Sequence, residues 1–286
     1  MDRKNKMATI QLAVFRLLAY AVIIFLCFLC LFFFAMLIIN ASRTNNQLQR
    51  GFTLIPGGHF LYNMRNAFRD TSIQIPRGML NSFIVAAGSA TLTTYFSALT
   101  AYGIYVYDFK LKKLAYTFIL AVMMIPNQVS AVGFVQLAYK YGFNNRLWAL
   151  IIPSIAAPAV FFYMYQYLKA TLPLDIVEAS RIDGSSEFAT FNRIVLPIMK
   201  PAMAVQMIFS FVAAWNNYFL PALLLTKSEK KTVPIMIAQL RSADYSKFDM
   251  GKVYMFILLA ILPVIVVYVF LSKSIIKGVT SGSVKG

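Results

Sequence analysis

The sequence is poor in charged residues, and acidic residues are the scarcest of them. Only 13% of its 286 residues are charged and 10 are aspartate or glutamate, whereas 59% are apolar and the mean hydropathy is +0.67. Soluble globular proteins have about 25% charged residues. This composition argues against a water-soluble enzyme, and the many apolar residues argue equally against a disordered chain.

Histidine and cysteine are nearly absent, which argues against metal and redox chemistry. The one histidine, His59, lies in a polar segment, and both cysteines, Cys27 and Cys30, lie in a single apolar run. A redox pair of cysteines needs access to water, which that run lacks. The sequence also contains no phosphate-binding loop, metal-ligand cluster or nucleophile–base set. We therefore expect no catalytic residue, no metal site and no cofactor in this chain.

The sequence is rich in long apolar runs. Six runs cover residues 17–39, 80–102, 114–137, 147–168, 202–226 and 253–272. An apolar helix of about 20 residues spans the hydrocarbon core of a bilayer, so the sequence predicts an all-α polytopic membrane protein with six transmembrane helices. The first run exceeds the about 7–15 apolar residues of a cleaved signal peptide. We expect residues 1–79 to form a signal-anchor helix and external loop, and residues 80–286 a five-helix core.

The charge that is present is basic, with a net value of +17 spread over the short segments between the apolar runs. This distribution favours a membrane surface over nucleic acid as the partner of the basic residues. Lysine and arginine are divided almost evenly between the two sides of a six-span chain. The positive-inside rule therefore does not orient it.

The clearest local pattern lies in the polar segment 169–200, which holds four of the ten acidic residues. Pro173 is suited to open a short helix, and Gly184 to end it in the left-handed conformation. Ser185 or Ser186 is suited to cap a second helix, which Pro197 is expected to stop. A connecting segment of this length is uncommon unless it is functional.

This segment resembles the EAA loop of the membrane subunits of ABC importers, whose pattern is EAA-x3-G-x9-I-x-LP. The matching residues are Glu178, Ala179, Ser180, Gly184, Ile194, Leu196 and Pro197, and only Ser180 departs, with one small residue replacing another. The residues around Asp183 are similar to the carbohydrate branch, the relatives of the smaller maltose-importer subunit. Weaker similarities, such as Asn81-Ser82 and Trp215-Asn216, extend the resemblance over nearly the whole chain from residue 80.

The resemblance implies a permease subunit of a binding-protein-dependent ABC importer for a disaccharide or oligosaccharide, in a bacterial cell membrane. In that family the loop is the coupling helix, which docks on a cytoplasmic ATPase dimer that binds ATP and magnesium. The other implied partners are a second permease subunit and an external solute-binding protein. Because ATP is cytoplasmic, both termini are expected there too. The implied coupling residues are Glu178, Ala179, Ser180, Asp183, Gly184, Phe188, Phe191, Leu196 and Pro197, the two phenylalanines as anchors in a pocket of the partner.

Neutral polar side chains within the apolar runs are candidates for a transport path. Gln206, Ser210 and Asn217 share one face of the fifth run, and Asn127 and Gln128 follow an expected kink at Pro126. Amides and hydroxyls beside aromatic rings suit a sugar. The same groups also suit interhelical hydrogen bonds worth about 0.6 kcal/mol each, and both interpretations stay open.

Two other classes of protein are alternatives. A secondary carrier or channel, not coupled to an ATPase, would not need an EAA loop, and a proton- or sodium-coupled carrier is expected to hold carboxylates within its apolar runs. A membrane-embedded transferase would need acidic or histidine chemistry at the membrane face. The apolar runs of this sequence lack both features.

Overall fold

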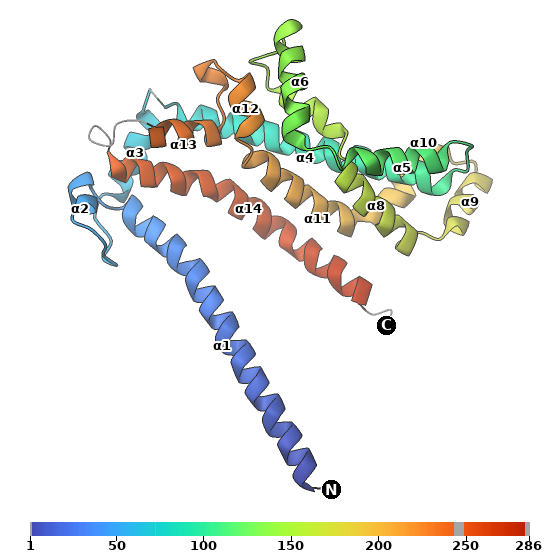
Figure 1. Ribbon diagram of the computed structural model, residues 1–286, viewed down its shortest axis with the longest axis horizontal. Helices are drawn as coiled ribbons and strands as arrows, with labels where there is room; N and C mark the ends of the chain where they lie inside the picture. Colours follow the sequence, from blue (N-terminus) through green and yellow to red (C-terminus); the bar gives the residue numbers. More distant parts are fainter. Residues whose placement is uncertain (1, 72, 243–248, 284–286) are drawn as a thin grey trace. The chain divides into compact units, whose positions relative to one another are not determined.

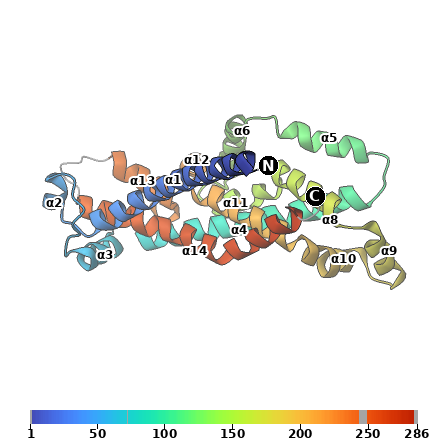
Figure 2. The ribbon, with the colours of Figure 1, turned by 90° about the horizontal axis from the view of Figure 1, so that it is seen from below.

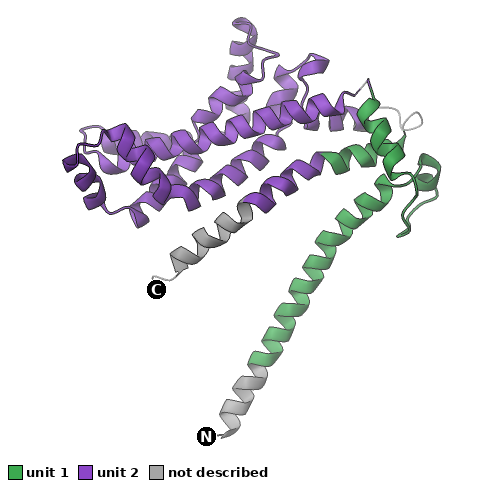
Figure 3. Ribbon diagram, turned by 180° about the vertical axis from the view of Figure 1, so that it is seen from behind, with its two compact units in different colours: residues 1–70, 243–259 green, residues 71–242, 260–286 purple. Residues whose placement is uncertain are grey.

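The part of the chain that the structure describes is helical. The computed structural model describes residues 2–71, 73–242 and 249–283, and no strand occurs among them. The predicted all-α class is confirmed. Contacts divide the chain into two compact units, unit 1 with residues 1–70 and 243–259 and unit 2 with residues 71–242 and 260–286 (Figure 3). The functional division at residues 79 and 80 stays a prediction.

Unit 1 combines one long helix with several short elements. Its helices are α1 (Asp2–Ala41), α2 (Asn45–Gln49), α3 (Phe60–Arg69) and the first residues of α14 (Met250–Ser283). Most α1 side chains from residue 12 to 39 are exposed and apolar. An apolar helix exposed on all sides is suited to lipid as its solvent.

Polar contacts hold the short elements of unit 1 together. The amide nitrogen Nδ2 of Asn63, on α3, donates to the carbonyl oxygens of Ala41 and Arg43, each at 2.9 Å. Lys252 of α14 forms an ion pair with Asp70 at the end of α3. These contacts fix the end of α1 and the start of α14 against α3.

Unit 2 is built around α4 (Ile75–Val106), which packs along α8 (Pro158–Thr171) and α11 (Leu196–Trp215), as Figures 1 and 2 show. Small residues on the buried face of α4 allow the helix backbones to approach closely, as is common in membrane helices. They are Ala86, Ser89, Ala90, Ser97, Ala98 and Ala101.

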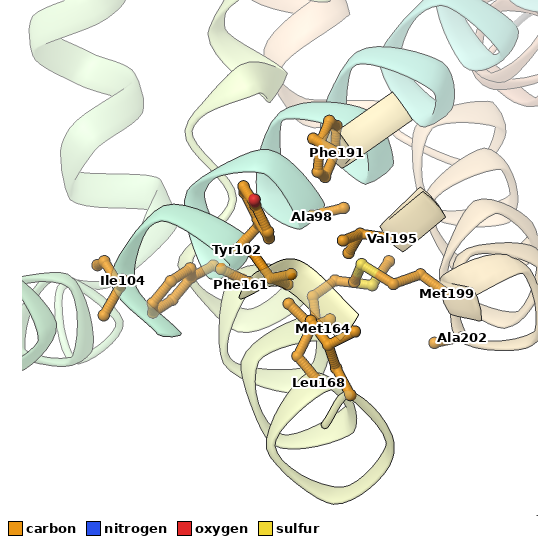
Figure 4. Close-up of a cluster of buried hydrophobic side chains, with 13 residues drawn as sticks. Ala98, Tyr102, Ile104, Phe161, Met164, Leu168, Phe191, Val195, Met199 and Ala202 are labelled. Atoms are coloured by element: carbon orange, nitrogen blue, oxygen red, sulfur yellow. The ribbon is translucent and has the colours of Figure 1, made fainter. Parts of the chain in front are cut away.

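A cluster of buried apolar side chains joins α4, α8 and the segment that leads into α11 (Figure 4). Met164 and Leu168 of α8 are fully buried, as is Met199 of α11. The ring of Phe191 lies against that of Tyr102 on α4, with 5.4 Å between the centroids. The cluster therefore holds both ends of the segment between α8 and α11 against α4.

Five helices are long and apolar enough to cross a bilayer, and a bent pair gives a sixth. The five are Leu12–Ala41, Ile75–Val106, Trp148–Thr171, Glu187–Trp215 and Met250–Phe270, and the pair is Lys112–Val122 with Asn127–Lys140. Each of them overlaps one predicted apolar run. With the bent pair counted as one span, the described helices correspond to the six spans that the sequence predicts.

The third apolar run is broken rather than kinked. The sequence predicts one helix bent at Pro126, but α5 (Lys112–Val122) and α6 (Asn127–Lys140) meet at 93°. The residues before the break form tighter i to i+3 bonds, such as Met123 N to Leu120 O at 3.1 Å. Pro126 has no N–H to resume the helix, so α6 starts anew in another direction.

The fourth and fifth runs are also interrupted. In the fourth, α7 (Trp148–Ile151) and a 3-10 turn at Ile152–Ile155 precede α8, which begins at Pro158. In the fifth, α11 stops at Trp215 and the short α12 (Phe219–Leu224) follows, where the sequence predicts one helix to residue 226. α12 lies beside α6 (Figure 1).

Different segments of the chain contact the two ends of α4. At its start, Asn81 Nδ2 donates to the carbonyl oxygens of Glu229 and Lys231, each at 3.0 Å, and so holds the 3-10 turn Ser228–Lys230 and the start of α13 (Val233–Ser242). Just past its other end, Tyr107 contacts the segment between α8 and α11. A helix of 32 residues is about 48 Å long, enough to place these two segments on opposite faces of a bilayer.

Candidate coupling loop and polar cavity

The segment between α8 and α11 is a tight turn between two short helices, and residues 173–197 are called the elbow below. α9 (Leu174–Ile182) follows Pro173, and α10 (Glu187–Thr190) follows Ser186, whose hydroxyl accepts a hydrogen bond from Ala189 N at 3.3 Å. Gly184 has φ +76°, and Ser185 N donates to Ser180 O at 3.0 Å, as in a Schellman ending. The two predicted helices and the glycine turn are confirmed.

A network of buried hydroxyls closes the elbow from inside. The side-chain oxygens of Ser180 on α9 and Thr190 on α10 lie 3.1 Å apart, and Thr190 Oγ1 also donates to Ser185 Oγ at 3.1 Å. Ser180 is 4% exposed and Thr190 is fully buried. Ser180, the one departure from the family pattern, therefore links the two helices of the elbow through its hydroxyl.

Glu187 connects the elbow to the end of α4. Its Oε2 accepts hydrogen bonds from the hydroxyls of Tyr107 at 2.5 Å and Tyr102 at 3.2 Å, and its Oε1 accepts from Arg181 Nε at 2.7 Å. Burial, with the Glu187 hydrogen bond next in size, raises the pKa of Tyr107, so its phenol stays protonated and keeps donating. The hydrogen bond with Glu187 raises the pKa of Arg181. The carboxylate is thus held by three donors from two parts of the chain.

The elbow runs into α11 through a widened turn, which corrects the predicted role of Pro197. Pro197 is expected to stop the helix, yet the chain is helical from Glu187 to Trp215. Residues Phe191–Val195 form a π-helical turn, in which Leu196 N bonds to Phe191 O five residues earlier. A proline within a regular helix clashes with the carbonyl four residues before it, and the wider turn relieves that clash.

The predicted coupling residues fall into exposed and buried groups. Glu178, Ala179, Asp183 and Gly184 are exposed, as are Pro197 and Phe188, which is 66% exposed. Leu196 is half-buried against the core cluster. Phe191 is fully buried between Tyr95 and Tyr102, so its ring packs within its own chain and is not presented as the partner anchor predicted for it. Ile182 on the elbow, which the sequence argument overlooked, is 87% exposed.

A cavity of about 680 Å³, called the polar cavity below, lies at the breaks in the three interrupted runs. Three of the predicted path residues line it: Asn127 at the start of α6, Ser210 on α11, and Asn217 just after α11. Gln128 and Gln206 are not among its lining residues. Helix breaks within a membrane leave backbone groups available to bind a solute, an arrangement that is common in transporters.

Hydroxyl groups that the sequence argument missed also line the polar cavity. Thr93 of α4 donates to Ser154 O at 2.7 Å, and the Ser154 hydroxyl, which donates to Ile151 O within its own run, also donates to Ser89 O of α4 at 3.3 Å. The two hydroxyls thus hold the broken fourth run against α4. In the described chain, no hydrogen bond engages the side chains of Asn127, Ser210 or Asn217, and no acidic or basic side chain lines the cavity. The free amide and hydroxyl groups can bind a neutral polar solute.

The chain belongs to the family of binding-protein-dependent transport system inner membrane components, whose model matches residues 90–279. It is 31% identical to the arabinooligosaccharides transport system permease protein AraQ of Bacillus subtilis, over 96% of this chain and 98% of that one. It is 29% identical to the lactose transport system permease protein LacG of Rhizobium radiobacter, over 98% and 100% of the two chains. It is thus a multi-pass membrane component of a transport system.

The fold matches a solved transporter. The structure superposes on a chain of a bacterial ABC transporter involved in the import of the acidic polysaccharide alginate, with a TM-score of 0.80 and 16% identity. The match covers 96% of this chain and 98% of that one. At this identity the likeness establishes the fold, namely that of an ABC importer permease.

Proposed function

We propose that this chain is the permease subunit of an ABC importer for a neutral disaccharide or oligosaccharide. The observation that carries the proposal is the polar cavity, whose largely apolar lining includes two amides and five hydroxyls but no ionisable group. Amides and hydroxyls form hydrogen bonds with sugar hydroxyls, and no charged side chain has to be desolvated when the sugar binds. The relatives named for arabinooligosaccharides, lactose, and trehalose and maltose support a sugar as the solute.

The test is uptake of labelled sugars by cells that depend on this chain. Asn217→Leu and Asn127→Leu should lower uptake about tenfold, which corresponds to about 1.4 kcal/mol of lost binding. Gln128→Leu is the matched control, because Gln128 is adjacent to Asn127 but lies outside the cavity lining. Equal uptake by all three variants, at equal amounts in the membrane, would show that the cavity does not bind the solute.

We infer further that a separate ATPase supplies the energy and binds to the exposed side of the elbow. Ile182 and Phe188 project exposed apolar surface there, and Glu178 is exposed on the same segment. An aromatic anchor beside a charged residue is a common pattern at protein interfaces. The proposal places the elbow and both termini in the cytoplasm, and a second permease subunit and an external solute-binding protein complete the importer.

Co-purification tests this partnership. Glu178→Arg should prevent an ATPase from co-purifying and should abolish uptake, while the chain still inserts in the membrane. Asp175→Arg makes the same change of charge in the first turn of α9, outside the matched motif. This variant should retain both ATPase co-purification and uptake. Normal ATPase recovery with Glu178→Arg would argue against the assignment. A secondary carrier or channel receives no support from the relatives or the fold.

A further inference from the structure

A second cavity lies beside the junction of α4 and α5. It has a volume of about 390 Å³ and is called the lysine pocket below, after Lys110, Lys112 and Lys113 in its lining. Ile104, Tyr116 and Tyr165 line it as well. It shares no residue with the polar cavity, so it is not part of the proposed transport path.

The lysine pocket carries positive charge that the described chain does not neutralise. Its lining holds three ammonium groups and one carboxylate, that of Asp108. None of the four is in a salt bridge among the residues that the structure describes, and the only hydrogen bond there from the three ammonium groups is from Lys112 Nζ to Tyr105 O at 3.3 Å. The pocket therefore has an excess of two positive charges and ammonium groups free to bind an anion.

Aromatic rings form the wall of the pocket on the side of α8. The rings of Tyr116 on α5 and Tyr165 on α8 lie 4.8 Å apart, and Ile104 beneath them is only 6% exposed. In the described chain, neither tyrosine hydroxyl has a hydrogen-bond partner. Tyrosines of this kind are enriched where membrane helices meet the headgroup layer.

The lysine pocket lies where a candidate membrane span ends. The span Ile75–Val106 ends just before the lysines, and α5 begins at Lys112. Lys112 and Tyr116, four residues apart, line the pocket from one side of α5. The exposed apolar residues Leu111, Leu114 and Phe118 lie on another side of that helix. The pocket itself therefore offers a site for a charged headgroup at the bilayer surface.

We propose that the lysine pocket binds the phosphodiester headgroup of an anionic phospholipid at the surface of the bilayer. Basic pockets between membrane helices are suited to such headgroups, because ammonium groups offset the phosphate charge at the bilayer surface. Tyr107 bonds to Glu187 of the elbow, and the next residue, Asp108, lines the pocket. The pocket therefore lies on the same side of the membrane as the elbow. That this side is the cytoplasmic leaflet rests on the proposed function, whereas the binding itself does not.

The test is native mass spectrometry of the chain, extracted with the subunits it assembles with and titrated with phosphatidylglycerol or phosphatidylcholine. Phosphatidylglycerol should bind at least about fivefold more tightly, and Lys113→Gln should reduce that preference about fivefold, as expected for one lysine near an anionic headgroup. K110Q/K112Q/K113Q should abolish the preference, and K110R/K112R/K113R should restore it. No transport assay is involved, so this result is independent of the proposed solute.

The matched control is K227Q/K230Q/K231Q, which removes the same charge beside the opposite end of α4, where Lys231 O accepts from Asn81. It should keep the preference for phosphatidylglycerol. The proposal is overturned if the two triple variants lose lipid equally, or if the unmodified assembly shows no preference because another subunit covers the pocket. It is also overturned if soluble glycerophosphoglycerol binds as tightly as the lipid, since the site would then be one for a free anion.

Discussion

Tyr107, the residue that follows α4, donates a hydrogen bond of 2.5 Å to Glu187, the residue that begins α10. Tyr102 donates to the same carboxylate oxygen, and Arg181 of α9 donates to the other. Both helices of the elbow are therefore tied to α4 through one side chain. Under the proposed function, a partner that displaced the elbow would act on α4, which lines the polar cavity with Val85, Ser89 and Thr93.

The first prediction concerns this connection. Tyr107→Phe should leave Glu187 with one donor fewer and lower the free energy of unfolding by about 1 kcal/mol, the usual net value of a hydrogen bond. Because the elbow would then move more independently of α4, more ATP should be hydrolysed for each sugar imported. The amount of ATP hydrolysed and the amount of sugar imported can both be measured in proteoliposomes. Tyr139→Phe is the control, because its hydroxyl bonds to Leu223 O, away from the elbow, and unchanged coupling in Tyr107→Phe would contradict the role of the contact.

The second prediction concerns the backbone at Gly184. With φ at +76°, any side chain with a branched Cβ costs about 1–2 kcal/mol, whereas asparagine tolerates the left-handed conformation. No atom outside the neighbouring residues lies within 4 Å of a Cβ added there, so the cost arises from the backbone alone. Gly184→Val should therefore reduce uptake strongly and Gly184→Asn only slightly. Proline, which cannot adopt a positive φ, should abolish uptake. Similar uptake by the valine and asparagine variants would refute this account.

The third prediction separates two phenylalanines that the sequence pattern treats alike. Phe188 is 66% exposed, so Phe188→Ala should leave stability unchanged and weaken recovery of the ATPase. Phe191 is fully buried against Tyr95 and Tyr102, so Phe191→Ala should open a cavity and destabilise the chain by about 3–5 kcal/mol. Thermal unfolding in detergent measures the second effect and co-purification the first. The reverse assignment of effects would show that the burial of Phe191 does not persist in the assembled transporter.

How far the sequence predicts this molecule depends on how local each feature is. The turn at Gly184 and the cap at Ser186 are predictable, because capping involves residues two or three positions apart. The contact between Tyr107 and Glu187 is not, because the two residues are 80 positions apart and hydroxyls of tyrosine carry no sequence signal for a partner. Pro197 wrongly predicts the end of a helix. The π-helical turn that accommodates this proline has no recognisable sequence pattern.

The polar cavity shows the same limit. Helical spacing correctly groups Ser210 with Asn217, yet it also adds Gln206, which does not line the cavity. Periodicity on one helix identifies a face but not the neighbouring elements, and here three breaks bring Asn127, Ser154 and Asn217 together. Two of the breaks coincide with prolines that the sequence shows, Pro126 before α6 and Pro158 at the start of α8, whereas the end of α11 at Trp215 has no such signal.

The last prediction is topological, because the even division of basic residues leaves the chain without orientation from charge. In unit 2, Asn81 near the start of α4 holds the carbonyl groups of Glu229 and Lys231, while Tyr107 at the other end holds Glu187. α4 is a continuous helix about 48 Å long, longer than the about 30 Å of hydrocarbon in a bilayer. Lys230 and Ser185 should therefore lie on opposite sides of the membrane.

Two cysteine variants test this arrangement. With the elbow in the cytoplasm, a membrane-impermeant thiol reagent added outside intact cells should label Lys230→Cys and spare Ser185→Cys, and it should label both after the membrane is permeabilised. The native Cys27 and Cys30 lie on α1 in an apolar stretch, where a polar reagent has little access, and the unmodified chain is the blank. In that orientation the segments 40–79 and 226–253, which are rich in lysine and arginine, face outside, and an acidic binding protein should dock on them less tightly as salt rises past about 0.15 M, where screening reaches about 8 Å. Labelling of Ser185→Cys alone would reverse the orientation, and with it the proposal that an ATPase contacts the elbow.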